Sequence, residues 1–487
     1  HVRFSSICSS PFLMRFPAAL TKISLMTVRA ALPIFGARLV VFCTALITGS
    51  ISGFAAEGTS GPSRLAVGET LEDFFTAAID FSPQLRIAEE GLNVGKAREK
   101  QAQGQLQPQI NANANLTDNT RNSFSQFGQP LNEQFDGERF SVSLQQVLFN
   151  WQAFAARRRA TQIENQLEAE YYFELSRLLT DVAQQYLSVL LAQDSLTSIS
   201  AEVNAVANQL NQIQTLFNLQ LAQITDLGQA EASLVATQAE QLRLEAELAI
   251  AQENLRAVTG IGVGELYVLS EEIEVPEAQN NMQYWVAMAE RNNQQVRARR
   301  YALEAAEESI SESRGAYMPR VNFFATRQES NVGFDNRFLG DIDTTYVGVD
   351  VTIPIYAGGT NRARESEARA QRNIAENELR QTELDANASV RSAFLKQQSS
   401  KMLTAAAGRL VVSTRLFSEA AQQGFELGTV TNVDVLNALR DQFQAERDLQ
   451  RARYDQINYL LLLKHEAGTL NGGDLTEISR LMVSPDA

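Results

Sequence analysis

Histidine and cysteine, which often carry catalysis or bind a metal, are scarce in this chain of 487 residues. His465 is the only histidine after residue 55, and both cysteines, Cys8 and Cys43, lie before that point. A histidine-based metal site would need ligands from several copies, so we expect His465 to be a packed or solvated helix residue. The glycine-rich run 260–264 follows a helical pattern, which indicates a helix end rather than a phosphate loop. The sequence predicts no enzyme, cofactor or metal site.

Two aspartates occupy matching places in similar short segments, Ile224-Thr225-Asp226-Leu227 and Val433-Asp434-Val435-Leu436. Each stands at the expected start of a helix. The helix macrodipole stabilises a carboxylate there by about 0.3–1 kcal/mol. We therefore expect Asp226 and Asp434 to have at least a structural role.

The charge balance argues against nucleic acid as a partner. The chain carries 42 Lys and Arg against 57 Asp and Glu, a net charge of −15. Binding to phosphates needs clustered basic side chains, and here the charges are dispersed. No run of 18 apolar residues follows the N-terminal region, so we expect no membrane-spanning helix. Strands of a membrane β-barrel would escape this test because they alternate apolar and polar residues.

The first 55 residues have the pattern of a leader with a secretory signal peptide. They hold five basic residues and no acidic one, and an apolar run from Leu39 to Ile47 precedes Gly53 and Ala55. Small residues at these two positions predict cleavage after Ala55. Because Cys43 follows Phe42 rather than a small residue, we expect no lipid anchor.

The sequence after residue 55 consists of two similar repeats. Gly104-Gln-Leu-Gln-Pro108 matches Gly315-Ala-Tyr-Met-Pro319, 211 residues later. Phe217 to Asp226 matches Phe425 to Asp434 at a separation of 208, which also relates Leu255 to Leu463. Such register indicates two repeats. We assign a first repeat to 56–270, a second to 271–475 and a C-terminal tail to 476–487.

Each repeat is expected to contain two long helices, at 149–218 and 224–260 and again at 358–426 and 432–467. Phe149 to Leu227 contains neither Gly nor Pro, so nothing forces a break. Apolar residues recur every seven positions, for example Val203, Leu210 and Phe217, with Ile199, Val206 and Ile213 in a second row. Sustained heptads predict coiled-coil packing.

Two strands precede the long helices of each repeat, expected at 108–117 and 138–148, and at 319–329 and 344–355. Apolar residues alternate there with polar ones that would line a lumen: Asn111, Asn113, Asn115, Ser141, Ser143 and Thr352. Period two with one apolar face predicts half-buried strands. The polar segments 117–137 and 330–343 are expected to be exposed loops. The fold class is therefore α+β, with strands and coiled-coil helices in tandem repeats.

With these features the chain resembles the TolC family of outer-membrane channels over about residues 69–480. The matching segments are those around Asp226 and Asp434, together with 467–475 at the end of the last helix. The resemblance implies a homotrimer, with a twelve-stranded β-barrel in outer-membrane lipid and a twelve-helix tube in the periplasm of a Gram-negative bacterium. Independently, four strands cannot close a barrel, so either two or three chains must pool them.

The function implied is a passive exit duct for efflux, type I protein secretion or both. It would be coupled to an ABC or RND-type inner-membrane transporter through a periplasmic adaptor protein. The alternative is a periplasmic coiled-coil scaffold, which would need no amphipathic strands. The missing lipid anchor favours the general and type I secretion branch of the family.

The resemblance also assigns a periplasmic gate. Positions matching Thr225, Asp226 and Asp434 line the narrow aperture, where three copies of Asp434 would form a cation-attracting ring. The family archetype has a second aspartate one turn later, an arginine and a gate tyrosine, where this chain has Asn437, Val430 and Phe425. An arginine latch therefore cannot be carried over, and we expect apolar closure by Phe425 and Val430.

Two further groups have both functional and structural interpretations. Gly428 and its counterpart Gln220 match the turns where adaptors dock, although a turn glycine can simply supply a positive φ. Arg157, Arg158 and Arg159 are interpreted either as a collar facing the membrane interface or as a solvated face.

Overall fold

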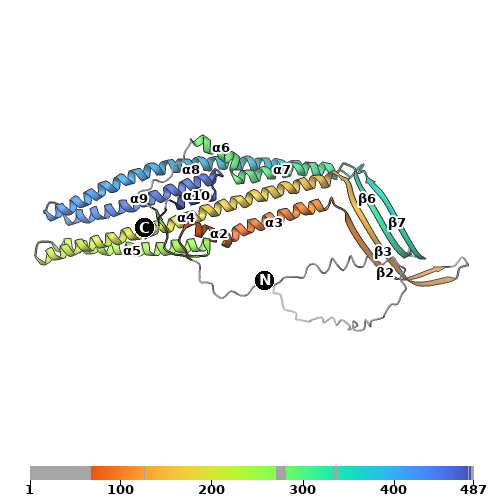
Figure 1. Ribbon diagram of the computed structural model, residues 1–487, viewed down its shortest axis with the longest axis horizontal. Coiled ribbons are helices and arrows are strands. Elements are labelled where there is room, and N and C mark those ends of the chain that lie inside the picture. Colours follow the sequence, from red (N-terminus) through yellow and green to blue (C-terminus); the bar gives the residue numbers. More distant parts are fainter. Residues whose placement is uncertain (1–66, 125–126, 270–280, 334–336, 481, 484–487) are drawn as a thin grey trace, which may run out of the picture. The chain divides into compact units, whose positions relative to one another are not determined.

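Four long helices and a four-stranded sheet dominate the computed structural model (Figure 1). It describes residues 67–124, 127–269, 281–333, 337–480 and 482–483. The expected leader, signal peptide and cleavage point lie outside the described residues. Leu65–Ala487 form one compact unit.

The elements of this unit follow the same order in both halves. The helices are α2 Leu71–Phe81, α3 Pro83–Gly104, α4 Trp151–Asn218, α5 Ile224–Thr259, α6 Met282–Asn292, α7 Gln294–Gly315, α8 Thr360–Glu426, α9 Asn432–Glu466 and α10 Gly472–Ser479. The long strands are β2 Gln109–Phe124, β3 Pro130–Asn150, β6 Arg320–Val332 and β7 Phe338–Thr352. Two-residue strands are β1 Val67–Gly68, β4 Gly262–Val263, β5 Val268–Leu269 and β8 Met482–Val483.

The helices pack as four neighbouring columns. α3 and α5 follow one another along one side of α4, and α7 and α9 follow one another between α4 and α8 (Figure 1). At about 1.5 Å per residue, the 68 residues of α4 make a rod on the order of 100 Å long. Asn150 caps its start by accepting a hydrogen bond from the Ala153 amide at 3.3 Å. The columns of one chain thus form a wall with an outer column on each side.

The sheet has the strand order β2-β3-β6-β7, antiparallel throughout, so β2 and β7 are its edges. Residues of one kind align across it. Ile110, Leu144, Ala325 and Val347 form an apolar row, and Asn113, Ser141, Gln328 and Thr344 a polar one. The apolar side is exposed in a single chain, with Ile110 69% and Val347 62% accessible. The expected polar face and apolar face are therefore both present.

The expectation that 117–137 and 330–343 are loops is wrong. β2 and β3 pair from Gln109 and Gln145 up to Phe124 and Pro130, and β6 and β7 continue beyond Ser330 after an irregularity. Strand pairing is made by backbone hydrogen bonds, which polar side chains such as Asn and Thr do not interrupt. Apolar residues stop alternating with polar ones in these segments, but the strand pairing continues.

An apolar core lies near the middle of the helical columns, and the short helices α2 and α10 and the two-residue strands β4, β5 and β8 pack into it. Phe74 of α2, Tyr186 of α4 and Leu255 of α5 are fully buried in it. The Tyr186 hydroxyl donates to the carbonyl oxygens of Glu69 and Tyr267 at 3.1 and 3.0 Å. Residues of the assigned tail belong to the same core: α10 crosses residue 475, and Met482 is buried where β8 pairs with β5.

The three consecutive arginines stay partly exposed and each forms an ion pair with a neighbouring helix, while their facing the membrane interface stays a prediction. Successive residues of a helix point about 100° apart, so they reach different neighbours. Arg157 pairs with Glu99 of α3, while Arg158 and Arg159 pair with Glu308 and Glu312 of α7. Arg158 also lies over the Trp151 ring, 5.3 Å from its centroid. Together they tie α4 to the columns on both sides just below the sheet.

In the part of the chain that the structure describes, no helix is both long and apolar enough to span a bilayer. The same residues contain no group of three or more His, Cys, Asp or Glu side chains arranged to hold a metal ion.

Candidate functional site at the helix-pair tips

Each pair of long helices ends in a short turn, which we call the first tip (219–223) and the second tip (427–431). The first requires a left-handed residue, and Gln220 supplies it with φ of 61°. The second uses Gly428 at the equivalent position, with φ of 74°. There the Thr429 amide donates to the Gly424 carbonyl at 2.8 Å. The two tips thus have the same backbone turn built from different residues.

Asp226 and Asp434 are both third residues of their helices and cap them. The Asp434 carboxylate accepts from the Thr431 hydroxyl at 2.6 Å and from the Thr431 amide at 3.3 Å. The Asp226 carboxylate accepts from the Gln223 amide at 3.2 Å. The structural role expected for both aspartates is therefore present.

The two aspartates differ in exposure. Asp434 is exposed, and Asn437, one turn further along α9, is exposed on the same side. Asp226 is half-buried, whereas its neighbour Thr225 is exposed and donates to the Gln223 side chain at 3.4 Å. Asp434 is therefore the more exposed of the two carboxylates.

Phe425 and Val430 contribute to the chain's own packing. Val430 packs with Ala421, Val435 and Leu439 between α8 and α9. A Cβ on Gly424 would lie 2.6 Å from Val430 Cγ2, so the two residues fit closely. Phe425 borders this cluster and also the one that contains Leu227 and Leu436. Both side chains are half-buried inside one chain.

A buried polar link, which the sequence analysis missed, joins the two helix pairs at the tips. Gln209 of α4 donates to the Asn432 side chain at 2.9 Å, and Asn432 donates to the Asp226 carbonyl at 3.3 Å. Gln209 and Asn432 are only 6% and 3% exposed. The start of α9 is therefore fixed to both α4 and α5.

Two more polar links join α4 and α9 further from the tips. Arg447 pairs with Glu202 at 2.7 Å, and the two side chains are only 13% and 5% exposed. Burial raises the pKa of the Glu202 carboxyl, while Arg447 opposes the shift. The Tyr454 hydroxyl donates to Asp194 at 2.7 Å. The signal for these residues was available, because Glu202 and Gln209 are seven residues apart, in register with the apolar heptads.

The tips also expose large apolar side chains. Leu219 and Leu221 of the first tip are 63% and 73% exposed, and Leu427 of the second is 79% exposed. Gln220 and Gly428 lie beside them and are exposed as well. Apolar groups rimmed by polar ones are typical of surfaces that bind another protein.

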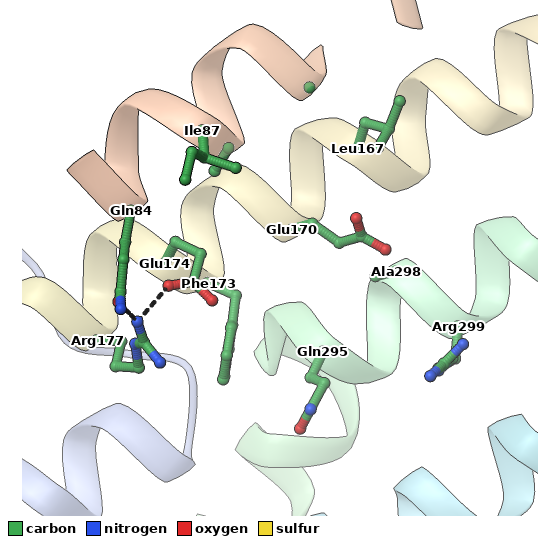
Figure 2. Close-up of a pocket in the computed structure, with 12 residues that line it drawn as sticks. Gln84, Ile87, Leu167, Glu170, Phe173, Glu174, Arg177, Gln295, Ala298 and Arg299 are labelled. Carbon is green, nitrogen blue, oxygen red and sulfur yellow. Dashed lines mark hydrogen bonds and ion pairs between the residues drawn. The ribbon is translucent and has the colours of Figure 1, made fainter. Parts of the chain in front are cut away.

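A groove on the wall, far along α4 from the tips, offers no reactive site. It has a volume of about 580 Å³ and lies between α3, α4 and α7 (Figure 2). Arg177 projects into it but is paired with Glu174 at 2.9 Å and hydrogen-bonded to Gln84. On the same helix, Ser176 Oγ lies 2.9 Å from Nδ1 of His465. Burial lowers the pKa of His465, and Arg177 adds to the shift. His465 is thus a packed helix residue.

Proteins similar to this chain match it over most of its length. The model of the family described as "Outer membrane efflux protein" matches residues 76–261 and 285–469, one match in each repeat. The chain is 26% identical to outer membrane protein TolC of Vibrio cholerae, over 87% of this chain and 96% of that protein. It is 24% identical to the alkaline protease secretion protein AprF of Pseudomonas aeruginosa, over 85% and 87%. The crystal structure of CusC, at 17% identity, has the same fold with a TM-score of 0.72 over 85% of this chain and 95% of CusC.

Proposed function

Because the chain belongs to the outer membrane efflux protein family, we propose that it is a trimeric outer-membrane exit duct for efflux, type I protein secretion or both. The family is one of channels rather than enzymes. Its members reside in the outer membrane of Gram-negative bacteria and extend into the periplasm. The duct itself would be passive, with transport driven by an inner-membrane transporter of the ABC or RND type.

The open edges of the four-stranded sheet carry the proposal. β2 and β7 each have a partner on one side only, and the apolar face of the sheet is exposed. In lipid, unpaired backbone groups at an edge cost several kcal/mol each, on the order of the penalty for any unsatisfied buried polar group. Further copies must therefore supply the missing strands. Three copies, the number in this family, close a barrel of twelve strands above a tube of twelve helical columns.

Electrical recording separates the duct from the scaffold alternative. Purified protein added to a planar lipid bilayer should insert and give discrete conductance steps of uniform size. A periplasmic scaffold would give none, and it would have no use for the exposed apolar rows of the sheet. Protein that stays soluble without detergent and never conducts would contradict the proposed function.

The tips are the proposed site of docking for a periplasmic adaptor. The exposed leucines Leu219, Leu221 and Leu427 flank Gln220 and Gly428 and offer the apolar contact that such a partner needs. Replacing Leu219 and Leu427 by Ser should abolish co-purification of the transporter complex after mild crosslinking. Val412→Ser, at an exposed position on α8 away from the tips, is the matched control and should leave co-purification intact. Equal recovery from both variants would contradict docking at the tips.

Asp434 is the proposed charge of the periplasmic gate, with Asn437, Thr225 and the half-buried Asp226 around it. A ring of three carboxylates at a constriction attracts cations. Asp434→Asn removes the charge and keeps an oxygen that can cap α9, so its effect is electrostatic. Cation selectivity, read from the reversal potential in a salt gradient, should fall in this variant and fall less in Asp226→Asn. Unchanged reversal potentials would remove Asp434 from the gate.

Phe425 and Val430 support closure in a different way from a latch between copies. Their side chains pack within the chain, so we propose that they hold the second tip in shape while Asn432 joins it to the first. Apolar packing is not screened by salt. The fraction of time that the channel stays closed should therefore change little as ionic strength changes.

A further inference from the structure

Between Ser195 and Ile213, α4 packs against α9 through a row of buried residues in which every second residue is polar. The buried residues of this row are spaced alternately by four and three positions: Ser195, Ile199, Glu202, Val206, Gln209 and Ile213. That spacing is the seam of a coiled coil. Glu202 and Gln209 find polar partners on α9, namely Arg447 and Asn432. The seam inside one chain is thus partly polar.

In the second repeat, α8 is the counterpart of α4, but it has apolar residues at the positions where α4 has polar ones. α4 and α8 end at Asn218 and Glu426, and α5 and α9 begin at Ile224 and Asn432, so the separation of 208 holds across both tips. Applied to the polar row, it gives Leu403, Leu410 and Phe417 of α8. These three apolar side chains are 63%, 50% and 58% exposed.

The same relation identifies what the row of α8 should face. α9, which covers the polar row of α4, corresponds to α5 of the first repeat. Arg447 and Asn432 correspond to Ala239 and Ile224, and both of these are exposed. Since α5 and α8 are the outer columns of one chain, this α5 must belong to another copy. Small Ala239 would meet Leu410, and Ile224 would meet Phe417.

We propose that Leu403, Leu410 and Phe417 of α8 form the surface that binds α5 of a second copy, opposite Ala239 and Ile224. The proposal rests on the duct being built from several copies and specifies which residues join them. The seam between copies is apolar where the seam within a copy is polar. This difference makes each helix specific for its partner, because a leucine row placed on Arg447 would leave that buried charge unpaired.

Mixed-copy crosslinking tests the pairing. A tagged chain carrying Phe417→Cys is co-expressed with an untagged chain carrying Ile224→Cys and treated with a short thiol crosslinker. Because both natural cysteines lie before residue 55, processed chains contain only the introduced thiols. A product containing one tagged and one untagged chain is expected. Phe417→Cys with Ile250→Cys is the control, because Ile250 is also exposed on α5 but lies 26 residues further along.

Mixed product from the control pair alone, or from neither pair while the protein still conducts as an oligomer, would overturn this pairing and leave the proposed duct standing. A monomer that does not conduct would instead contradict the duct itself. As a second test, Leu410→Gln should shift solubilised protein from oligomer to monomer. Val412→Gln, 70% exposed and two residues away on another side of α8, should not. Oligomer retained in both variants would also contradict the proposed surface.

Discussion

The polar row of α4 and the apolar row of α8 occupy equivalent positions in two copies of one design, yet their surroundings are reversed. Glu202 and Gln209 are polar and buried, whereas Leu410 and Phe417 are apolar and exposed in one chain. A buried polar layer lowers stability but specifies the partner and its register. The two repeats therefore keep the same backbone and differ in which neighbouring helix each long helix accepts.

The largest expected effect comes from breaking the buried pair of the α4–α9 seam. Arg447→Ala leaves the Glu202 carboxylate buried without its cation, which should lower the free energy of unfolding by about 3–5 kcal/mol. The equivalent change at Arg415, which pairs with Glu446 at a half-exposed site between α8 and α9, should cost at most about 1 kcal/mol. Urea unfolding followed by helical circular dichroism measures both.

A double variant sharpens this result. Replacing both Glu202 and Arg447 by Leu removes the pair without leaving a charge unpaired, so most of the lost stability should return. If the double variant is as unstable as Arg447→Ala, the penalty does not come from an unpaired charge.

The tips offer a second, smaller contrast. Gln220 and Gly428 share a left-handed conformation that side chains with a Cβ adopt at a cost of about 1 kcal/mol. Gly428→Gln should therefore destabilise the second tip, and Gln220→Gly should stabilise the first or leave it unchanged. Hydrogen exchange of the helix ends next to each tip reports the change locally. Equal protection in both variants would show that neither turn is strained.

The caps of α5 and α9 should respond by a similar or slightly smaller amount. The Thr431 side chain accepts from the Asp434 amide at 3.3 Å, and losing such a cap costs about 1 kcal/mol. Both alanine variants keep the backbone amide that the aspartate accepts from, but Gln223 makes no side-chain cap hydrogen bond, so Gln223→Ala should cost less than Thr431→Ala. Hydrogen-exchange rates in the first turns of α5 and α9 measure both effects. Faster exchange in the Gln223 variant than in the Thr431 variant would contradict this prediction.

The smallest effect concerns pH and His465. Burial lowers its pKa, so the folded chain binds the proton less readily than the unfolded chain does. The associated stability is present above the unfolded value of about 6.5 and is lost as pH falls below it. The unfolding midpoint should drop between pH 7 and pH 5.5, and by less in His465→Gln, which stays neutral. An identical drop in both proteins would exclude His465 as the cause.

The sequence was informative where one physical rule dominates. Absence of Gly and Pro predicted the long helices, and α4 begins two residues after the expected start and ends at the expected residue, 218. The strands extend further than predicted because backbone pairing continues where apolar alternation stops. The polar link through Gln209 and Asn432 was missed because the heptads were traced through apolar residues alone. The half-burial of Val430 depends on its close fit to Gly424, six residues earlier at the end of α8, which follows from how the chain turns at the second tip.

The most direct test of this account is the mass of the detergent-solubilised protein by light scattering. One chain has two unpaired strand edges and, on its outer columns, apolar side chains left exposed. The protein mass is expected to be three times that of the processed chain, with both helix and strand in circular dichroism. A stable, folded monomer would contradict it, because a single chain cannot close its sheet in a membrane.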